Sequence, residues 1–427
     1  GRGEGESRDR GDEVPEVGAA EGRGEGESRD RGDEVPEVGA AEEPRKGRRR
    51  KMKSLEELRK QLDEIDSQIV ELYERRMDVC GQVGNYKIET GKKVFDKNRE
   101  IEKLHAVTAD VEDGFYKKGL TELFEQLMAQ SRKLQYQMLT KKGALGRLPF
   151  IGVDALDLEG ARIVFQGTDG AYSQAAMFKY FGRDIDSFHV QTFRDAMEAI
   201  EEGSADFAVL PIENSSAGMV TEMYDLLVEF ENYIVGEVEL PVEHALTGVE
   251  GASISTIRRV YSHPQALMQS AKYLDEHRDW QQIGVANTAV AAKKIVEEKD
   301  VAQAAICSAH AAEIYGLKVL DSKINDNDNN STRFIIVTNQ KIFLKDAKKI
   351  SICFEVAHES GSLYHLLSHF IYNDLNMTKI ESRPIEGRTW EYRFFVDFEG
   401  NMSEGAVKNA IRGLREEAKS LKILGNY

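Results

Sequence analysis

The sequence predicts a multidomain protein with three classes of fold: an all-α module, an α/β domain and a smaller α+β domain. Its 427 residues suit two or three domains, and 41% hydrophobic residues are enough for ordinary cores. The spacing of apolar residues changes along the chain. A helical period covers 54–140, short β-rich runs alternate with helices from residue 161, and residues 349–427 have the order β-α-β-β-α-β.

Charge and cysteine content exclude several classes of protein. A net charge of −17 argues against a general nucleic-acid or membrane-surface binder. No apolar run approaches the ~18 residues of a membrane span, and no secretory leader is visible. Cys80, Cys307 and Cys353 lie far apart, without the spacing of a disulfide scaffold or a zinc module. We therefore expect a cytoplasmic protein that binds no nucleic acid, membrane or metal.

The first residues form a charged repeat. Residues 1–21 recur without change as 22–42, and residues 43–51 hold six bases and one acid. This composition leaves almost nothing to bury, so we expect residues 1–51 to be a disordered tail. The basic run could also be a nucleic-acid or membrane patch, but a solvated tail without a part in the activity is the simpler interpretation.

A long first helix is predicted over residues 54–88. Ser54 and Glu57 form a capping box at its start, and Thr90-Gly91 ends it. A helix of this length needs a partner along it, which favours a dimer. Two further helices are expected over 96–110 and 119–140. The first helix carries an apolar stripe with steps of three and four residues: Leu55, Leu58, Leu62, Ile65, Ile69, Leu72, Val79 and Val83.

Charged side chains on these helices have a spacing that suits one site. Arg76 and Lys87 are three turns apart and point the same way within ~20°. Arg59 lies about 100° around the same helix and ~25 Å along it. It does not easily serve the same site, but it could serve a site on a dimer partner. The second and third helices add Asp96, Arg99, Glu100, Ser131 and Gln135.

These eight polar residues, in this order, resemble those of the all-helical chorismate mutase family. The resemblance implies rearrangement of chorismate to prephenate, a pericyclic reaction that requires no nucleophile, base or metal. The enzyme holds a dianion in a compact conformation. The residues that would hold its carboxylates are Arg76, Arg59 of a partner chain, Arg99 in support, and Ser131.

The remaining four residues would act at the reacting part of the substrate. By the same resemblance, Lys87 and Gln135 would donate hydrogen bonds to the breaking ether oxygen, where negative charge develops. Asp96 and Glu100 would address the ring hydroxyl.

The middle of the chain alternates strands and helices after a linker at 141–160. This alternation indicates a layered α/β domain with a largely parallel sheet. Polar loops follow several strands, where α/β sheets place ligand sites. The expected strands are 161–166, 207–212, 258–262, 304–308 and 333–338, the helices 173–182, 192–202, 264–277 and 288–299, and the loops 167–174, 211–218, 261–269 and 328–334.

Three motifs in these loops resemble the prephenate dehydratase family: PIENSSAG at 211–218, YSHPQ at 261–265 and TRF at 332–334. The resemblance covers 161–340 and implies a two-lobed, periplasmic-binding-protein-like domain that converts prephenate to phenylpyruvate. It makes Thr332 essential, which we interpret as a proton or hydrogen-bond donor to the departing hydroxyl. The implied substrate-binding residues are Asn214, Ser262, Gln269 and Arg333.

A nucleophile–base pair of Ser262 and His263 is an alternative use of the YSHPQ motif. We consider it unfavourable, because neighbouring residues on a strand point to opposite faces of the sheet.

The C-terminal residues resemble the ferredoxin-like ACT domain, in the version that binds phenylalanine at a domain pair. The family's Gly-Ala-Leu-Val motif reads Gly-Ser-Leu-Tyr at 361–364, and its Glu-Ser-Arg-Pro motif is intact. His365 and His369 are spaced as in some metal sites, but no third ligand is evident. The implied effector residues are Gly361, Ser362, Leu363, Asn376, Glu381, Ser382, Arg383 and Pro384.

Together, these resemblances imply a bifunctional enzyme of phenylalanine biosynthesis that needs no cofactor and is inhibited by phenylalanine. We expect a homodimer or a higher homo-oligomer. Two alternatives stay open: a dehydratase that prefers arogenate, and a non-catalytic regulator that binds small molecules. The expected divisions are the tail at 1–51, the mutase domain at 52–140, the linker at 141–160, the dehydratase domain at 161–340 and the ACT domain at 347–427.

Overall fold

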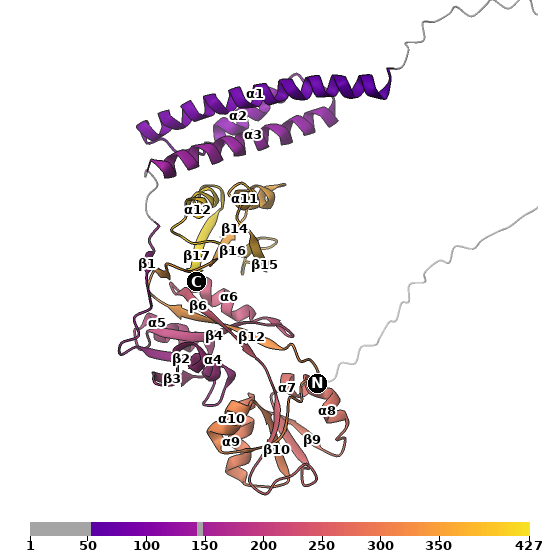
Figure 1. Cartoon of the computed structure of the whole chain (residues 1–427), viewed down its shortest axis with the longest axis vertical. Helices are drawn as coiled ribbons and strands as arrows, with labels where there is room; N and C mark the ends of the chain where they lie inside the picture. Colours follow the sequence, from indigo (N-terminus) through magenta and orange to yellow (C-terminus); the bar gives the residue numbers. More distant parts are fainter. Residues whose placement is uncertain (1–52, 143–147) are drawn as a thin grey trace, which may run out of the picture. The chain divides into compact units, whose positions relative to one another are not determined.

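The computed structural model describes residues 53–142 and 148–427 (Figure 1). The predicted tail at 1–51 lies outside them. The described chain divides into two units between Asp66 and Ser67. Among the described residues, no helix is both long and apolar enough to cross a membrane.

Three helices come first in the described chain: α1 (Leu55–Thr90), α2 (Lys97–Thr108) and α3 (Gly114–Lys141). The predicted capping box begins α1, with Glu57 N donating to Ser54 Oγ at 3.1 Å and Ser54 N donating to Glu57 Oε2 at 2.9 Å. The third helix begins before residue 119, because Asp113 caps it by accepting hydrogen bonds from two backbone amides. The three predicted helices are therefore confirmed, with one corrected start.

The α/β region contains thirteen strands and seven helices in the described residues. The strands are β1 (Ile151–Val153), β2 (Arg162–Gln166), β3 (Asp186–Val190), β4 (Phe207–Asn214), β5 (Gly218–Met219), β6 (Tyr233–Pro241), β7 (Ala245–Gly248), β8 (Arg259–Ser262), β9 (Gln281–Gly284), β10 (Gln303–Cys307), β11 (Lys318–Ser322), β12 (Ser331–Thr338) and β13 (Ile342–Leu344). The helices are α4 (Tyr172–Phe181), α5 (Phe193–Glu201), α6 (Thr221–Glu229), α7 (Pro264–Met268), α8 (Ala271–Asp275), α9 (Thr288–Glu298) and α10 (Ala309–Tyr315).

These strands form two lobes, each built on a mixed sheet. One sheet has the order β11-β7-β10-β8-β9, and the other contains β6-β12-β4-β2-β3. The expected largely parallel sheet is found only in part, since β2 is parallel to β3 and β4 while β12 is antiparallel to β4 and β6. The chain leaves the second sheet after β6, forms the other lobe, and returns through β12, which pairs antiparallel with β6.

The C-terminal module has the elements β14 (Lys349–Glu355), α11 (Ser362–Ile371), β15 (Met377–Pro384), β16 (Tyr392–Glu399), α12 (Gly405–Glu417) and β17 (Ser420–Asn426). Its strand order β15-β16-β14-β17 confirms the ferredoxin-like prediction. Both helices lie on one face of the sheet (Figure 1), where Phe354, Phe370 and Phe398 form the buried core. β17 pairs with β6 where Gly425 lies opposite Ile234. Only glycine fits at this position, because a Cβ would lie 2.1 Å from the Ile234 carbonyl oxygen.

Candidate active sites

A cavity of about 160 Å³ is lined by residues of α1, α2, α3 and the loop before α2. The glycine at position 84 lets α1 and α3 approach each other here, since a Cβ would lie 3.1 Å from Gln135 Cγ. The eighth predicted residue, Arg59, is exposed on the first turns of α1. The structure brings the other seven predicted residues to this cavity: Arg76, Lys87, Asp96, Arg99, Glu100, Ser131 and Gln135.

Hydrogen bonds hold several of these side chains in place. Arg76 Nη1 donates to Ser131 Oγ at 2.6 Å and to the Leu127 carbonyl oxygen at 2.9 Å. Lys87 Nζ donates to the Val94 carbonyl oxygen at 2.6 Å. Burial lowers the pKa of Lys87 from its ordinary value, although Asp96 and other acids oppose the shift. The ammonium group is therefore held in a partly dehydrated position, where its charge acts more strongly than in water.

Two further residues of the cavity are Asp96, which is held by a helix cap, and Gln135, which is buried. Asp96 caps α2 by accepting a hydrogen bond from Arg99 N at 3.1 Å, which fixes its carboxylate at the cavity. Gln135 is 5% exposed, and its Oε1 has no hydrogen-bond partner among the described residues. This amide oxygen accepts hydrogen bonds only, so it needs a donor, whereas the Nε2 group of Gln135 can donate to a ligand.

A second cavity, of about 400 Å³, lies between the two lobes at the ends of β4 and β12. Thr332 and Asn214 face each other on these strands, and Asn214 Nδ2 donates to Thr332 Oγ1 at 2.9 Å. Asn214 Oδ1 accepts from the backbone amides of Ser216 and Ala217 at 3.0 and 2.8 Å, which orients its amide group. Because Thr332 accepts this hydrogen bond, its own hydroxyl proton can be directed into the cavity.

Of the other predicted residues of the dehydratase domain, only Gln269 lines this cavity. His263 lines it as well. Ser262 is fully buried and donates to the Ile306 carbonyl oxygen at 2.6 Å, whereas His263 Nδ1 accepts from Gln265 N. The two neighbours thus have different partners, which agrees with the argument against a nucleophile–base pair.

Arg333 does not line the cavity, because it points to the other face of β12 from Thr332. Its guanidinium forms ion pairs with Glu213 at 2.8 Å, Glu237 at 3.2 Å and Asp397 at 3.6 Å. These contacts join β12 to β4, β6 and β16 on the side of β12 away from Thr332.

Two residues of this cavity escaped the sequence analysis, His244 and Tyr172. His244 Nε2 lies 3.0 Å from Gln269 Oε1, and His244 Nδ1 lies 3.0 Å from the Tyr172 hydroxyl. Burial lowers the pKa of His244 and so favours the neutral ring, although the hydrogen bond to Gln269 opposes the shift. No local spacing signals this set, because its members come from three distant segments of the chain.

The effector motifs of the C-terminal module occupy two places. Ser362 and Leu363 line a cavity of about 390 Å³, and Gly361 begins α11 with a φ of +82° that favours glycine. The Glu381–Pro384 motif lies on β15, the edge strand of the sheet, and Asn376 precedes this strand. None of these last five residues lines that cavity in the described part of the chain.

The fold and its cavities define a class of enzyme with a helical site, a cleft between two α/β lobes and a ferredoxin-like module. The chorismate mutase type II family model matches residues 58–136, and the prephenate dehydratase model matches residues 163–342. A bifunctional chorismate mutase/prephenate dehydratase from Escherichia coli is 31% identical over 379 residues, which cover 87% of this chain and 95% of the relative. The chain belongs to the bifunctional chorismate mutase/prephenate dehydratase family.

Two solved structures are similar to part of the chain. A prephenate dehydratase from Arthrobacter aurescens, in complex with L-Phe, is 30% identical with a TM-score of 0.58, over 62% of this chain and 89% of that chain. GqqA, described as a quorum quenching acylase, is 32% identical with a TM-score of 0.58, over 62% and 97% of the two chains.

The predicted activities are therefore confirmed: the protein has chorismate mutase and prephenate dehydratase activities of phenylalanine biosynthesis. The interpretation as a non-catalytic regulator is wrong.

Proposed function

We propose that the helical cavity rearranges chorismate to prephenate and that the cleft between the lobes converts prephenate to phenylpyruvate. The convergence of Lys87, Gln135 and Arg76 on one cavity, apart from the Thr332–Asn214 pair in another, is the observation that carries this assignment. We place the folded domains at 52–140, 161–340 and 347–427. The predicted linker at 141–160 contains β1, which pairs with β13 and so belongs to the folded part of the chain.

In the mutase site, Arg76 and Ser131 bind a substrate carboxylate together, as their mutual hydrogen bond supports. Lys87 and Gln135 donate to the ether oxygen as its bond to carbon breaks, and this stabilises the charge that develops only in the transition state. Asp96 and Glu100 accept from the ring hydroxyl. Arg99 contributes positive charge at the cavity.

In the dehydratase site, Thr332 donates its proton, or a hydrogen bond, to the hydroxyl that leaves as the ring becomes aromatic. Asn214 orients Thr332 through the hydrogen bond between Nδ2 and Oγ1. Gln269 binds the substrate from the other lobe. Ser262 and Arg333 hold the strands around the cleft through their contacts with Ile306 and with three acids. Their predicted contact with prephenate is tested by mutagenesis.

The C-terminal module binds L-phenylalanine and inhibits the dehydratase. Support comes from the Arthrobacter aurescens relative, whose structure is described as a complex with L-Phe. Within one chain, Ser362 and Leu363 line a cavity while Glu381–Pro384 lie on an edge strand. An unpaired strand edge is a template for pairing, so we expect two modules to pair along β15. Such pairing would bring both motifs to one site.

A second copy of this chain covers the apolar stripe of α1. Leu62, Ile69 and Leu72 are more than half exposed in the single chain, although a helix normally buries such a stripe. The resulting homodimer would let Arg59 of the partner subunit reach the substrate carboxylates. We place the enzyme in the cytoplasm, because its three scattered free cysteines suit a reducing compartment.

Mixed dimers test the shared site. A dimer of one Arg59→Ala subunit and one Lys87→Ala subunit should recover part of the mutase activity, because one of its two sites has both residues intact. Turnover of homodimeric variants alone is the baseline. Equal inactivity of the mixed and homodimeric preparations would refute the cross-subunit site.

Substrate preference requires a separate comparison. Prephenate should be turned over faster than arogenate, since the fused mutase supplies prephenate. Faster turnover of arogenate would favour the alternative dehydratase.

A further inference from the structure

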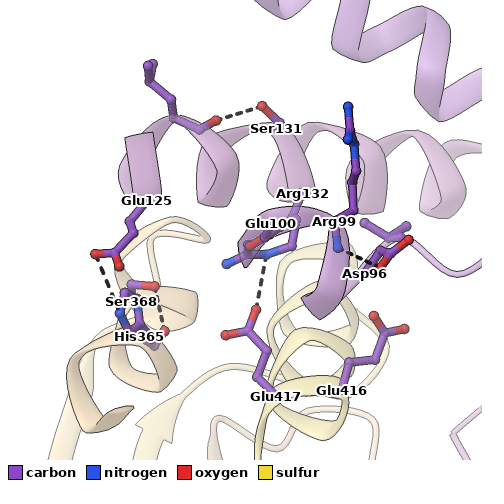
Figure 2. Close-up of polar contacts among 12 residues, drawn as sticks. Asp96, Arg99, Glu100, Glu125, Ser131, Arg132, His365, Ser368, Glu416 and Glu417 are labelled. Carbon is purple, nitrogen blue, oxygen red and sulfur yellow. Dashed lines mark hydrogen bonds and ion pairs between the residues drawn. The ribbon is translucent and has the colours of Figure 1, made fainter. Parts of the chain in front are cut away.

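The C-terminal module places a buried acid beside the mutase helices. Glu417 Oε1, at the end of α12, lies 3.1 Å from Arg132 Nε on α3 and 3.2 Å from His369 Nε2 on α11. The three side chains are each less than a tenth exposed. Figure 2 shows the Arg132 side chain between Glu417 and Glu100.

The other end of Arg132 reaches a residue of the mutase cavity. Arg132 Nη1 donates to the two carboxylate oxygens of Glu100, at 2.6 and 2.5 Å. Both Glu100 and Arg132 line the cavity that contains Lys87. Burial favours the neutral form of Arg132, but Glu417 and Glu100 outweigh it and raise the pKa of the guanidinium. The arginine therefore stays charged between two acids.

Backbone geometry in the C-terminal module supports this arrangement. A Cβ at Gly413 would lie 2.3 Å from the His369 ring, so only glycine leaves room for the histidine that contacts Glu417.

Beside this cluster, Tyr136 donates to Glu416, and Thr140 Oγ1 donates to Asn409 Oδ1 at 2.5 Å. The contact between α3 and α12 thus extends over several turns.

The negative charge of the substrate explains why Glu100 needs a cationic partner such as Arg132. Chorismate is a dianion, and an unpaired Glu100 carboxylate would repel it and could adopt several rotamers. Arg132 offsets this charge and fixes the carboxylate by donating to both of its oxygens. We propose that Arg132 is a positioning residue of the mutase site and that Glu417 of the C-terminal module holds it there. The inference rests on the proposed role of Glu100.

Variants of the full chain test this inference through mutase kinetics. Arg132→Met should lower kcat/KM for chorismate about tenfold or more, with a higher KM and a lower kcat, because Glu100 loses its position and its counter-charge. Arg132→Lys should recover part of this loss. Glu417→Gln should lower mutase kcat/KM several-fold. The dehydratase activity of each variant reports correct folding and should stay within about twofold of wild type.

Two comparisons separate the inference from its premise. Arg415→Met changes an exposed arginine on the same helix as Glu417 and should leave both activities unchanged. In a Glu100→Gln background, Arg132→Met should add less than about twofold, because Arg132 acts through Glu100. A Glu100→Gln enzyme with normal mutase activity would contradict the proposed role of Glu100 itself.

If Glu100→Gln loses activity while Arg132→Met and Arg132→Lys retain normal mutase kinetics, the positioning role is overturned and the role of Glu100 stands. If Arg132→Met loses activity but Glu417→Gln does not, the link to the C-terminal module is overturned.

Discussion

Replacing Lys87 by methionine removes the cationic donor of the mutase site while keeping a side chain of similar length. Lys87 Nζ donates one hydrogen bond, to the Val94 carbonyl oxygen, so two of its three N–H groups remain for the substrate. A unit charge about 4 Å from a developing negative charge contributes about 4 kcal/mol near a protein surface. Removal of one preorganised donor typically costs a factor of about 10² to 10³ in kcat.

We therefore expect Lys87→Met to lower mutase kcat a hundredfold to a thousandfold, measured as the disappearance of chorismate. Lys93→Met changes an exposed lysine near the same loop and serves as the matched control. Dehydratase turnover in the same preparation should be unchanged. A Lys87→Met enzyme with kcat within about threefold of wild type would refute the role of Lys87.

Three further predictions concern pH, the dehydratase and stability. Lys87 donates when protonated and its pKa is lowered, so mutase kcat/KM should fall as pH rises through a value below 10.5; an alkaline limb that is unchanged in Lys87→Arg would count against this. Thr332→Ala should reduce phenylpyruvate formation about a hundredfold or more, and Thr332→Ser should retain much of it, with mutase turnover as the control. Arg333→Met leaves three acids without their shared partner, and it should lower the free energy of unfolding in urea by about 3 kcal/mol. The control Lys345→Met breaks an exposed ion pair and should lower it by less than about 1 kcal/mol. Wild-type stability combined with a raised KM for prephenate would instead support substrate binding by Arg333.

Local patterns predicted the elements that local interactions determine. The capping box at Ser54 and the ferredoxin-like order of the C-terminal module follow from short-range spacing, and the structure contains both. The direction of β12 could not be predicted in this way. It depends on the chain leaving one lobe and returning from the other, which no window of the sequence records.

Family motifs located much of each site, but not the residues that support it. Motif matching found Thr332 and Asn214, which the structure places in hydrogen-bond contact. It missed His244, whose partners lie in distant segments, and Arg132, whose second acid belongs to the C-terminal module. Such contacts depend on how elements pack, so only the folded chain reveals them.

One departure from a family motif has a structural counterpart. Tyr364 stands where the effector motif usually has valine, and its hydroxyl accepts a hydrogen bond from Gln126 Nε2 on α3 at 2.7 Å. The sequence shows the substitution, whereas the structure shows a contact with the mutase helices that the larger side chain makes possible.

The central claim is that one chain holds two separate sites that act in sequence. The most direct test is a time course of chorismate, prephenate and phenylpyruvate with wild type, Lys87→Met and Thr332→Ala. Wild type should form phenylpyruvate from chorismate, Thr332→Ala should accumulate prephenate, and Lys87→Met should convert added prephenate but not chorismate. Loss of both activities in either well-folded variant would contradict the claim.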